Sequence, residues 1–358
     1  MKYFFDIDFI RSYSHSNQND FIQSDFKEFV RGLKSAPHKR IEVIIFHDEA
    51  LQKTDIEENY IYELLCDSNV SFRKKEDLNQ ILEDEESTSF KFFFIDTILH
   101  GTDISNDYGF FASNTKDLAV KWENVSSNYR CRKYLSETPS PYNITKWADI
   151  SFCNLPINCI VISDRYFLKD RTNFEINLFG LLRNLGLKAL RKRKVDIFMI
   201  TEVVREVEKN ENTEIKRKKD NEQFVESFMR IQDFLNELIG EEKYNYTLIK
   251  VDKKAEVKPH EVHDRLLYTN VLFINPGNSF DFFEFAKSRQ KVKAGTIINF
   301  DNFFWDGARG PNLELLIQLK LAFDIVSDRA KIGSDGPYYR VLTHNEKSCG
   351  LLKQLDNN

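Results

Sequence analysis

The sequence predicts a fold of two α/β domains, and three observations carry this prediction. The chain has 358 residues, which is enough for two domains that each bury a core. Short apolar runs typical of buried strands alternate with segments of helical spacing in both halves of the chain. Between the halves, residues 136–142 contain two prolines together with Ser and Thr, a composition typical of a domain boundary.

These patterns divide the chain into four parts. We predict an N-terminal domain at residues 1–135, a linker at 136–156, a second domain at 157–326 and a C-terminal tail at 327–358. The tail is polar and contains glycine, and we predict no element in it.

The N-terminal domain is expected to hold a partly parallel sheet, because strand-like and helix-like segments alternate in it. Apolar runs predict strands at residues 3–10, 41–46 and 90–95. Apolar residues at helical spacing predict helices at residues 21–33, 56–65 and 78–82.

The second domain shows the same alternation over a longer stretch. Strands are predicted at residues 159–162, 195–201, 246–251, 266–269 and 296–298. Helices are predicted at residues 178–185, 224–238 and 313–323. The charged segment 208–220 is expected to be an exposed loop.

Charge and cysteine content narrow the class of protein. The net charge is −5, so any contact with a polyanion must come from a local basic patch. Five scattered cysteines predict free thiols in a reducing cytoplasm. The start of the chain lacks the pattern of a signal peptide, and no apolar run reaches the roughly 18 residues of a membrane span. We therefore predict a cytoplasmic protein.

A motif in the second domain points to phosphate chemistry. His263 and Arg265 lie two residues apart at the start of a β-prone run, so their side chains are expected to point the same way. An imidazole can attack phosphorus, and the planar fork of an arginine can hold phosphate oxygens in pairs. Asn270 follows after four residues, and Gly277-Asn278-Ser279 follows after six more.

This spacing resembles that of phospholipase-D-type phosphodiesterases, which carry His-x-Lys, four residues, Asp, six residues and Gly-Ser. Here arginine replaces the lysine, asparagine replaces the aspartate and asparagine follows the glycine. The chain more specifically resembles the phospholipase-D-like domain found behind MIT domains and its bacterial relatives. Three earlier segments follow the order of that family: Asp164-Arg165-Tyr166, residues 177–185 and Met199-Ile200-Thr201. The Gly277–Phe283 segment completes a match over about residues 157–290.

The resemblance implies a mixed sheet flanked by helices and a catalytic set of His263, Arg265 and Asn270. It implies cleavage of nucleic acid without a metal or another cofactor, and a homodimer, because the chain holds one motif where a full site needs two. The resemblance to this family also leads us to expect a role in defence against foreign nucleic acid, such as antiviral defence. Eukaryotic members bind phospholipids and are thought to lack catalysis. The alternative is therefore a non-catalytic module that binds nucleic acid, phospholipid headgroups or a protein.

Further residues of the second domain are candidates for the same site. Asp164 ends a strand where ligands often bind, and otherwise caps the following turn. Arg191 and Arg193 belong to a basic run that either faces the substrate or ends a helix as a solubilising segment. Asp281 or Glu284 would orient the imidazole. The expected substrate-binding residues are Asp164, Gly277, Asn278, Ser279, Arg191 and Arg193.

The N-terminal domain carries acidic residues at or near the ends of its predicted strands, namely Asp6, Asp8, Asp48, Glu49 and Asp96. Such residues can bind Mg²⁺ for nuclease chemistry, as in PIN-like folds, and residues 113–117 are similar to a PIN-type strand end. Residues 9–15 are similar to the opening of TIR domains, with one extra residue. Otherwise this domain is expected to serve as a scaffold or to bind a protein partner.

Overall fold

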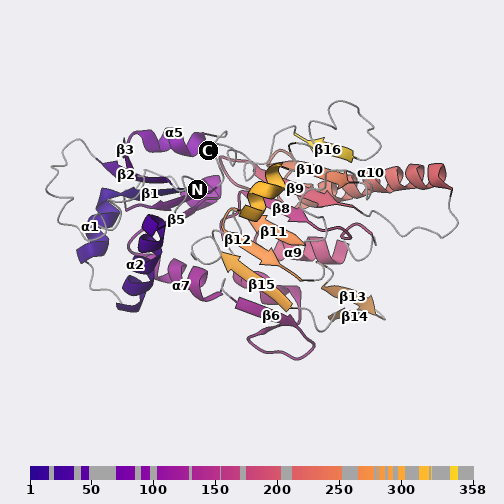
Figure 1. Ribbon diagram of the computed structural model, residues 1–358, viewed down its shortest axis with the longest axis horizontal. Coiled ribbons are helices and arrows are strands. Elements are labelled where there is room, and N and C mark those ends of the chain that lie inside the picture. The colour runs from indigo at the N-terminus through magenta and orange to yellow at the C-terminus, as the bar shows by residue number, and fades with distance from the viewer. Residues whose placement is uncertain are drawn as a thin grey trace.

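The computed structural model has an N-terminal sheet and a larger second sheet, which lie at opposite ends of the view in Figure 1. The structure describes residues 1–15, 20–35, 42–47, 70–84, 90–96, 103–128, 131–153, 155–169, 175–202, 212–251, 265–277, 280, 282–286, 289–292, 297–302, 314–321, 324 and 339–345. Both sheets are flanked by helices, so the predicted α/β class is confirmed. No helix within these ranges is long and apolar enough to cross a membrane.

The N-terminal sheet is parallel throughout and has the order β3-β2-β1-β4-β5. Its strands are β1 (Lys2–Asp6), β2 (Glu42–His47), β3 (Val70–Lys74), β4 (Lys91–Phe94) and β5 (Phe111–Ser113). Its helices are α1 (Ile7–His15), α2 (Asp20–Ser35), α5 (Asp77–Glu83), α6 (Ile104–Tyr108) and α7 (Leu118–Asn128). The direction of strand order reverses between β1 and β4.

Alternation along β1 divides the core of this unit into two layers. Tyr3 and Phe5 lie in one cluster of buried side chains with residues of α1, α2 and α7. Phe4 lies in the other cluster, with residues of α5 and α6. Successive residues of a strand point to opposite faces, so helices cover both faces of the sheet. The Phe4 ring stacks on Phe93 of β4 at 4.6 Å, which places part of the chain's phenylalanine excess in this core.

The second sheet has nine strands in the order β16-β10-β9-β8-β11-β12-β15-β6-β7. They are β6 (Cys131–Leu135), β7 (Asn143–Ile144), β8 (Cys159–Ser163), β9 (Val195–Thr201), β10 (Tyr244–Val251), β11 (Leu266–Thr269), β12 (Leu272–Asn275), β15 (Ile297–Asn302) and β16 (Tyr339–His344). β8, β9 and β10 are parallel, whereas β16 and β11 run antiparallel to their neighbours. A separate hairpin joins β13 (Phe283–Ala286) and β14 (Arg289–Val292).

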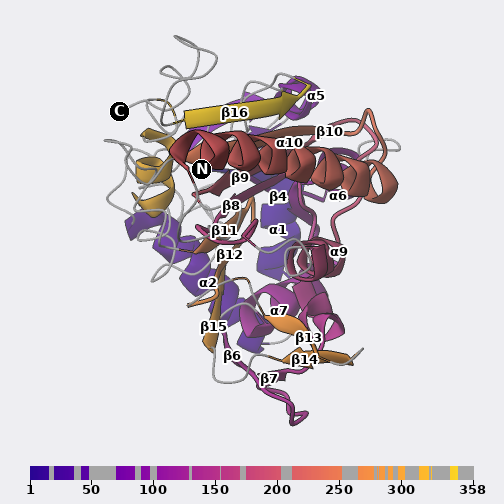
Figure 2. The ribbon, with the colours of Figure 1, turned by 90° about the vertical axis from the view of Figure 1, so that its right-hand side faces the viewer.

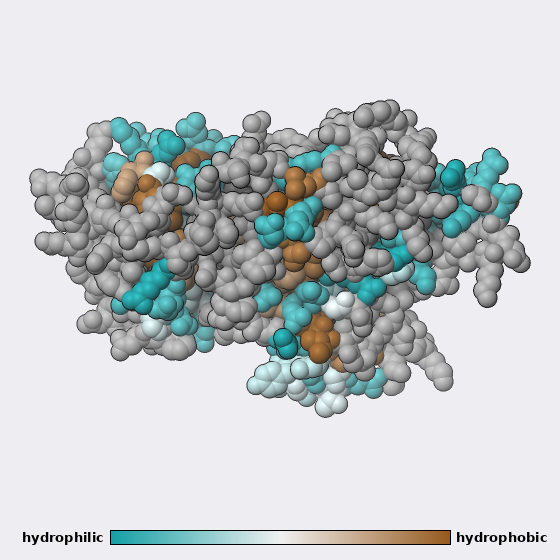
Figure 3. Space-filling model, in the orientation of Figure 1, coloured by the Kyte–Doolittle hydropathy of each residue, from teal (hydrophilic) through white to brown (hydrophobic). Residues whose placement is uncertain are grey.

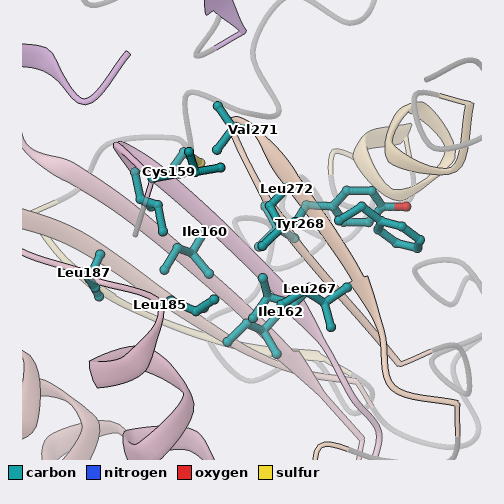
Figure 4. Close-up of a cluster of buried hydrophobic side chains, with 14 of the residues drawn as sticks. Cys159, Ile160, Ile162, Leu185, Leu187, Leu267, Tyr268, Val271 and Leu272 are labelled. Carbon is teal, nitrogen blue, oxygen red and sulfur yellow. The ribbon is translucent and has the colours of Figure 1, made fainter. Parts of the chain in front are cut away.

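Helical segments pack on this sheet. They are η1 (Trp147–Cys153), η2 (Glu175–Phe179), α9 (Gly180–Asn184), α10 (Thr213–Leu238) and residues 314–321. Figure 4 shows Ile160 and Ile162 of β8 beside Leu267 of β11, with Leu185 and Leu187 from the segment after α9. Figure 2 shows α10 side by side with β16, where the Arg340 guanidinium lies 5.8 Å from the Phe224 ring.

Several predicted elements have different bounds in the structure. Residues 7–10 were predicted as the end of a strand but begin α1, because the Asp6 carboxylate accepts a hydrogen bond from the Phe9 N–H at 2.6 Å. Residues 213–220 are helical rather than a loop, and Asn212 caps this helix by accepting from the Glu214 N–H at 2.8 Å. The predicted helix at 56–65 lies outside the described residues.

The predicted boundary between the domains is also displaced. Residues 136–142 connect β6 to β7, so their prolines mark a turn between two strands of the second sheet. Ile144 and Ile150 of the predicted linker are buried in the core. The second unit therefore begins at β6, and part of the predicted tail forms its edge strand β16.

A buried polar joint connects the two units. Asn158, at the start of β8, donates its amide to the Tyr108 carbonyl at 3.3 Å. Asn270, at the β11–β12 turn, donates to the Gly109 carbonyl at 2.9 Å. Both asparagines are at most 1% exposed. Hydrogen bonds in such dry surroundings hold the two units in one orientation, because separating them would leave buried polar groups without partners.

Candidate functional site

The candidate site lies at the carboxyl end of the second sheet, which we define as the end where β8, β9 and β10 finish and β11 begins. The antiparallel register pairs Leu266 with Ser163, so Arg265 is next to the residues that follow β8. Asp164 and Arg265, which are 101 positions apart in the sequence, meet here. This end is remote from the joint to the N-terminal unit.

Asp164 links two loops of the site. It is fully buried, and one carboxylate oxygen accepts from the Tyr166 N–H at 2.7 Å. The other oxygen accepts from the Phe280 N–H at 3.1 Å. Asp164 therefore caps the turn that follows β8, which is one of the two roles that the sequence predicted for it. It also holds the segment after β12 against the end of β8.

Arg265 is fixed in place without a hydrogen bond to its guanidinium from any residue that the structure describes. Its Nε lies 3.9 Å from Asp164 Oδ1, which is an ion pair, and the guanidinium lies 5.6 Å from the centre of the Tyr166 ring. The side chain is 18% exposed. Its Nε is buried and lacks a hydrogen-bond acceptor within the described ranges. The N–H groups of this guanidinium thus have no acceptor among the described residues, and 18% of the side chain is exposed.

A second buried arginine lies beside the first. Arg165 pairs with Glu202 at 2.8 Å, and both side chains are nearly inaccessible to solvent. The Arg165 guanidinium lies 4.9 Å from the centre of the Tyr166 ring, so this one ring contacts two guanidinium groups. The Thr201 hydroxyl donates to the Arg165 carbonyl at 3.2 Å and joins the ends of β8 and β9.

Glu202, Arg165 and Tyr166 are therefore parts of this site that sequence reasoning did not single out. Arg165 and Tyr166 stand inside the Asp-Arg-Tyr segment of the resemblance, which was a usable signal. Glu202 directly follows Met199-Ile200-Thr201, and no sequence motif identifies it as a site residue. Its Oε1 lies 2.8 Å from the Arg165 guanidinium, so the carboxylate is held by this ion pair.

The glycine of the motif forms a turn at the same end of the sheet. Gly277 has a φ of +69°, a conformation that favours glycine, and its N–H donates to the Asn275 side chain at 2.9 Å. Beyond it, Asn177 accepts from the Phe282 and Phe283 N–H groups at 2.9 Å each. The sequence did not identify Asn177 as the residue that anchors this segment.

Several expected site residues lie outside the described residues, namely His263, Asn278, Ser279 and Asp281. Glu284 belongs to β13, and the structure does not describe its side chain.

Asn270 lies at the opposite end of β11 from Arg265. The five steps between them span about 17 Å of extended chain, so the two side chains cannot hold one phosphate group. The Asn270 amide accepts from the Asn158 N–H at 3.0 Å and donates to the Gly109 and Pro156 carbonyls. The expected catalytic position of Asn270 is thus incompatible with its place in the joint.

Arg191 and Arg193 also lie away from the site, in the segment before β9 begins. Arg191 pairs with the buried Asp107 of the N-terminal unit at 3.4 Å. The Arg193 guanidinium lies 5.2 Å from the centre of the Phe110 ring, and Arg193 is only 8% exposed. About 20 Å of strand separates this segment from Glu202. The structure therefore places both arginines against the N-terminal unit, away from Asp164 and Arg265.

The acidic residues of the N-terminal unit gather where its parallel strands end. Asp6, which is 1% exposed, ends β1. Asp96 follows β4 and accepts from the Thr115 N–H at 2.7 Å. Asp8 pairs with Lys75 at 2.7 Å, whereas Asp48 and Glu49 lie outside the described residues. Within the described part of the chain, no three His, Cys, Asp or Glu side chains are placed to hold a metal ion.

Comparisons with known proteins leave the family open. No protein-family model matches the sequence, and no curated protein matches it significantly.

Proposed function

We propose that the carboxyl end of the second sheet binds a phosphodiester group of nucleic acid and that the chain cleaves it as a phospholipase-D-like nuclease. The observation that carries the proposal is the state of Arg265. This guanidinium is held by Asp164 and Tyr166, yet it lacks a hydrogen-bond acceptor among the described residues. A planar guanidinium with free N–H groups suits the paired oxygens of a phosphate.

The chemistry assigned to this site is a two-step displacement at phosphorus. An imidazole nitrogen of His263 attacks phosphorus, the bond from phosphorus to the leaving oxygen breaks, and a second histidine gives that oxygen its proton. Water then attacks the phosphohistidine, loses a proton to the second histidine and releases the first imidazole. The second histidine would be His263 of another copy, so the proposal includes a homodimer. Asn270 plays no part in it.

Cleavage of labelled single- and double-stranded DNA and RNA in EDTA tests the proposal. We expect wild type to cleave at least one substrate, His263→Ala to bind without cleaving, and Arg265→Ala to lose affinity. Arg191→Ala is the matched control, because it removes a cation from the far end of the sheet. Cleavage that survives in His263→Ala, or that stops in EDTA, would contradict this mechanism.

The same cluster also favours a binding module without catalysis. Asp164, Arg165, Glu202 and Arg265 together carry no net charge, and an asparagine stands in the joint where the family has an aspartate. Binding that needs Arg265, is unchanged in His263→Ala and occurs without turnover would support this module. The ligand would then be nucleic acid, a phospholipid headgroup or a protein.

The topology of the N-terminal unit favours a second candidate function, a metal-dependent nuclease of PIN-like type. Asp6 ends β1 and Asp96 follows β4, and the strand order reverses between these two strands. Ligands of open parallel sheets bind outside the carboxyl ends at such a reversal. Cleavage that requires Mg²⁺ and is lost in Asp96→Asn, while His263→Ala retains it, would support this candidate.

A further inference from the structure

The first two turns of α10 carry a cluster of cations at the carboxyl end of the second sheet. Lys250 of β10 pairs with Asp220 of α10 at 3.6 Å, and Lys250 is registered with Thr201 of β9. β9 in turn lies beside β8, which Asp164 directly follows. Neighbouring strands are about 4.8 Å apart, so β10, on which Asp220 fixes α10, lies about 14 Å across the sheet from β11, the strand that Arg265 precedes.

The start of α10 extends past the ends of these strands. α10 runs antiparallel to β10, since Phe228 stacks on Tyr246 and the Tyr244 hydroxyl bonds to Asn236 further along the helix. The seven residues before Asp220 therefore continue beyond β10 for about 10 Å at the rise of an α-helix. Figure 3 shows hydrophilic residues on the part of the molecule that α10 occupies in Figure 1.

Four consecutive cations occupy this extension: Lys216, Arg217, Lys218 and Lys219. We call them the α10 arm. Successive residues of a helix turn by about 100°, so the four surround the helix axis instead of forming one face against the sheet. Arg217 and Lys218 are exposed and form no ion pair with any residue that the structure describes.

The helix dipole does not explain the arm, because its effect is confined to the first turn of a helix and these four cations begin four residues after the N-cap Asn212. Clustered like charges repel one another, and a bound polyanion would relieve this repulsion. The nearby end of β8 also holds a polar group in need of a partner, since Ser163 is 2% exposed and its hydroxyl has no hydrogen bond within the described ranges.

We infer that the α10 arm binds the sugar–phosphate backbone of a nucleic acid strand that continues into the site at Asp164 and Arg265. This inference rests on the proposed function and names a polymer as the substrate. The four residues of the arm span about 5 Å of the α-helix, and a DNA strand presents a phosphate about every 3.4 Å of its axis, so the arm can contact about two phosphates. A lone headgroup at Arg265 would not reach the arm.

The salt dependence of binding tests the inference. Each phosphate contact contributes about 0.7 to the slope of log affinity against log salt for a single strand, and about 0.9 for duplex DNA. The double variant Arg217→Gln, Lys218→Gln keeps good helix formers and removes two exposed cations. In the His263→Ala background, we expect its slope for a labelled oligonucleotide to fall by about 1.4 for a single strand or about 1.8 for a duplex.

The control variant is Lys146→Gln, Lys243→Gln, which makes the same change in net charge. Both control lysines are exposed; Lys146 follows β7 and Lys243 precedes β10, away from the arm. Equal slopes in the two double variants would overturn the inference. So would an arm-dependent affinity for vesicles of phosphatidylcholine and phosphatidylserine without any for the oligonucleotide.

The same experiment separates this inference from the proposed function. If Arg265→Ala and His263→Ala abolish cleavage while the arm variant binds like wild type, the inference fails and the proposed function stands. If the arm variant loses affinity while His263→Ala and Arg265→Ala cleave like wild type, the arm binds nucleic acid that is cleaved at another site. This result would contradict both the inference and the proposed function.

Discussion

Lys91 is a buried cation near the joint between the two units. It is 2% exposed, its ammonium donates to the Ile81 carbonyl, and it lies 5.3 Å from the centre of the Phe110 ring. The Arg193 guanidinium lies near the same ring. Burial, together with the positive charge of Arg193, lowers the pKa of Lys91 from its usual 10.5 to about 7.

This lowered pKa makes stability depend on pH. Between about pH 7 and 10.5 the unfolded chain keeps the Lys91 proton while the folded chain releases it, so the free energy of unfolding rises with pH across this window. Lys91→Met removes this pH-dependent contribution to the free energy of unfolding. We expect it to raise the free energy of unfolding at pH 7, by on the order of a few kcal/mol at most, and by less at pH 9.5.

Urea denaturation of Lys91→Met and wild type at pH 7 and pH 9.5 measures this effect. The exposed Lys146→Met is the control, and we expect it to leave the difference between the two pH values unchanged. A Lys91→Met variant whose gain is the same at both pH values would show that Lys91 stays protonated in the folded chain.

At the scale of elements, the β11–β12 hairpin connects the candidate site to the joint. Arg265 precedes β11 at the site, and the Asn270 turn lies at the other end. The Thr269 hydroxyl accepts from the Leu272 N–H at 2.8 Å and closes this turn. One short hairpin therefore carries Arg265 of the candidate site at one end and a structural residue at the other, although both belong to one sequence motif.

Asn270→Asp distinguishes these two roles. A carboxylate at this position cannot donate to the Gly109 and Pro156 carbonyls, and it would place negative charge against two carbonyl oxygens. We expect the free energy of unfolding to fall by about 3 kcal/mol, because two buried acceptors lose their partners. Thermal denaturation measures the change. Wild-type stability together with faster cleavage would instead support a catalytic residue at 270.

At the scale of the whole molecule, we expect the joint to make the two units unfold as one cooperative structure. One cluster of buried apolar side chains extends from the N-terminal sheet to the second sheet. Gly109 lies at the centre of the joint with a φ of +68°, and a Cβ added to it would lie 2.8 Å from the Asn158 Cβ. A larger residue there acts as a wedge between the units.

Gly109→Ala tests this cooperativity, with Gly240→Ala as its matched control. Both glycines have positive φ, but a Cβ on Gly240 would meet only Lys243 at 3.7 Å, so the control isolates backbone strain of about 1 kcal/mol. We expect wild type and Gly240→Ala to unfold in one calorimetric transition, and Gly109→Ala to unfold at lower temperature in two. A single transition in Gly109→Ala with the stability of the control would contradict a tight joint.

The sequence by itself determined the elements with strong local patterns. The strand at 195–201 has the predicted bounds, and the strands β8 and β11 and the long helix through 224–238 lie where apolar spacing placed them. These patterns are readable because periodicity depends only on neighbouring residues. The order of segments in the resemblance also placed Asp164 and Arg265 in one candidate site. The catalytic role of this site stays a prediction.

Only the tertiary structure decided which polar residues serve the joint and which serve the site. Arg191, Arg193 and Asn270 look like phosphate ligands in the sequence, but their partners come from the N-terminal unit. The pairing of Arg165 with Glu202, and the place of β16 at the edge of the sheet, depend on strands that are far apart in the chain. Such contacts arise from the packing of whole elements, so no local pattern of residues encodes them.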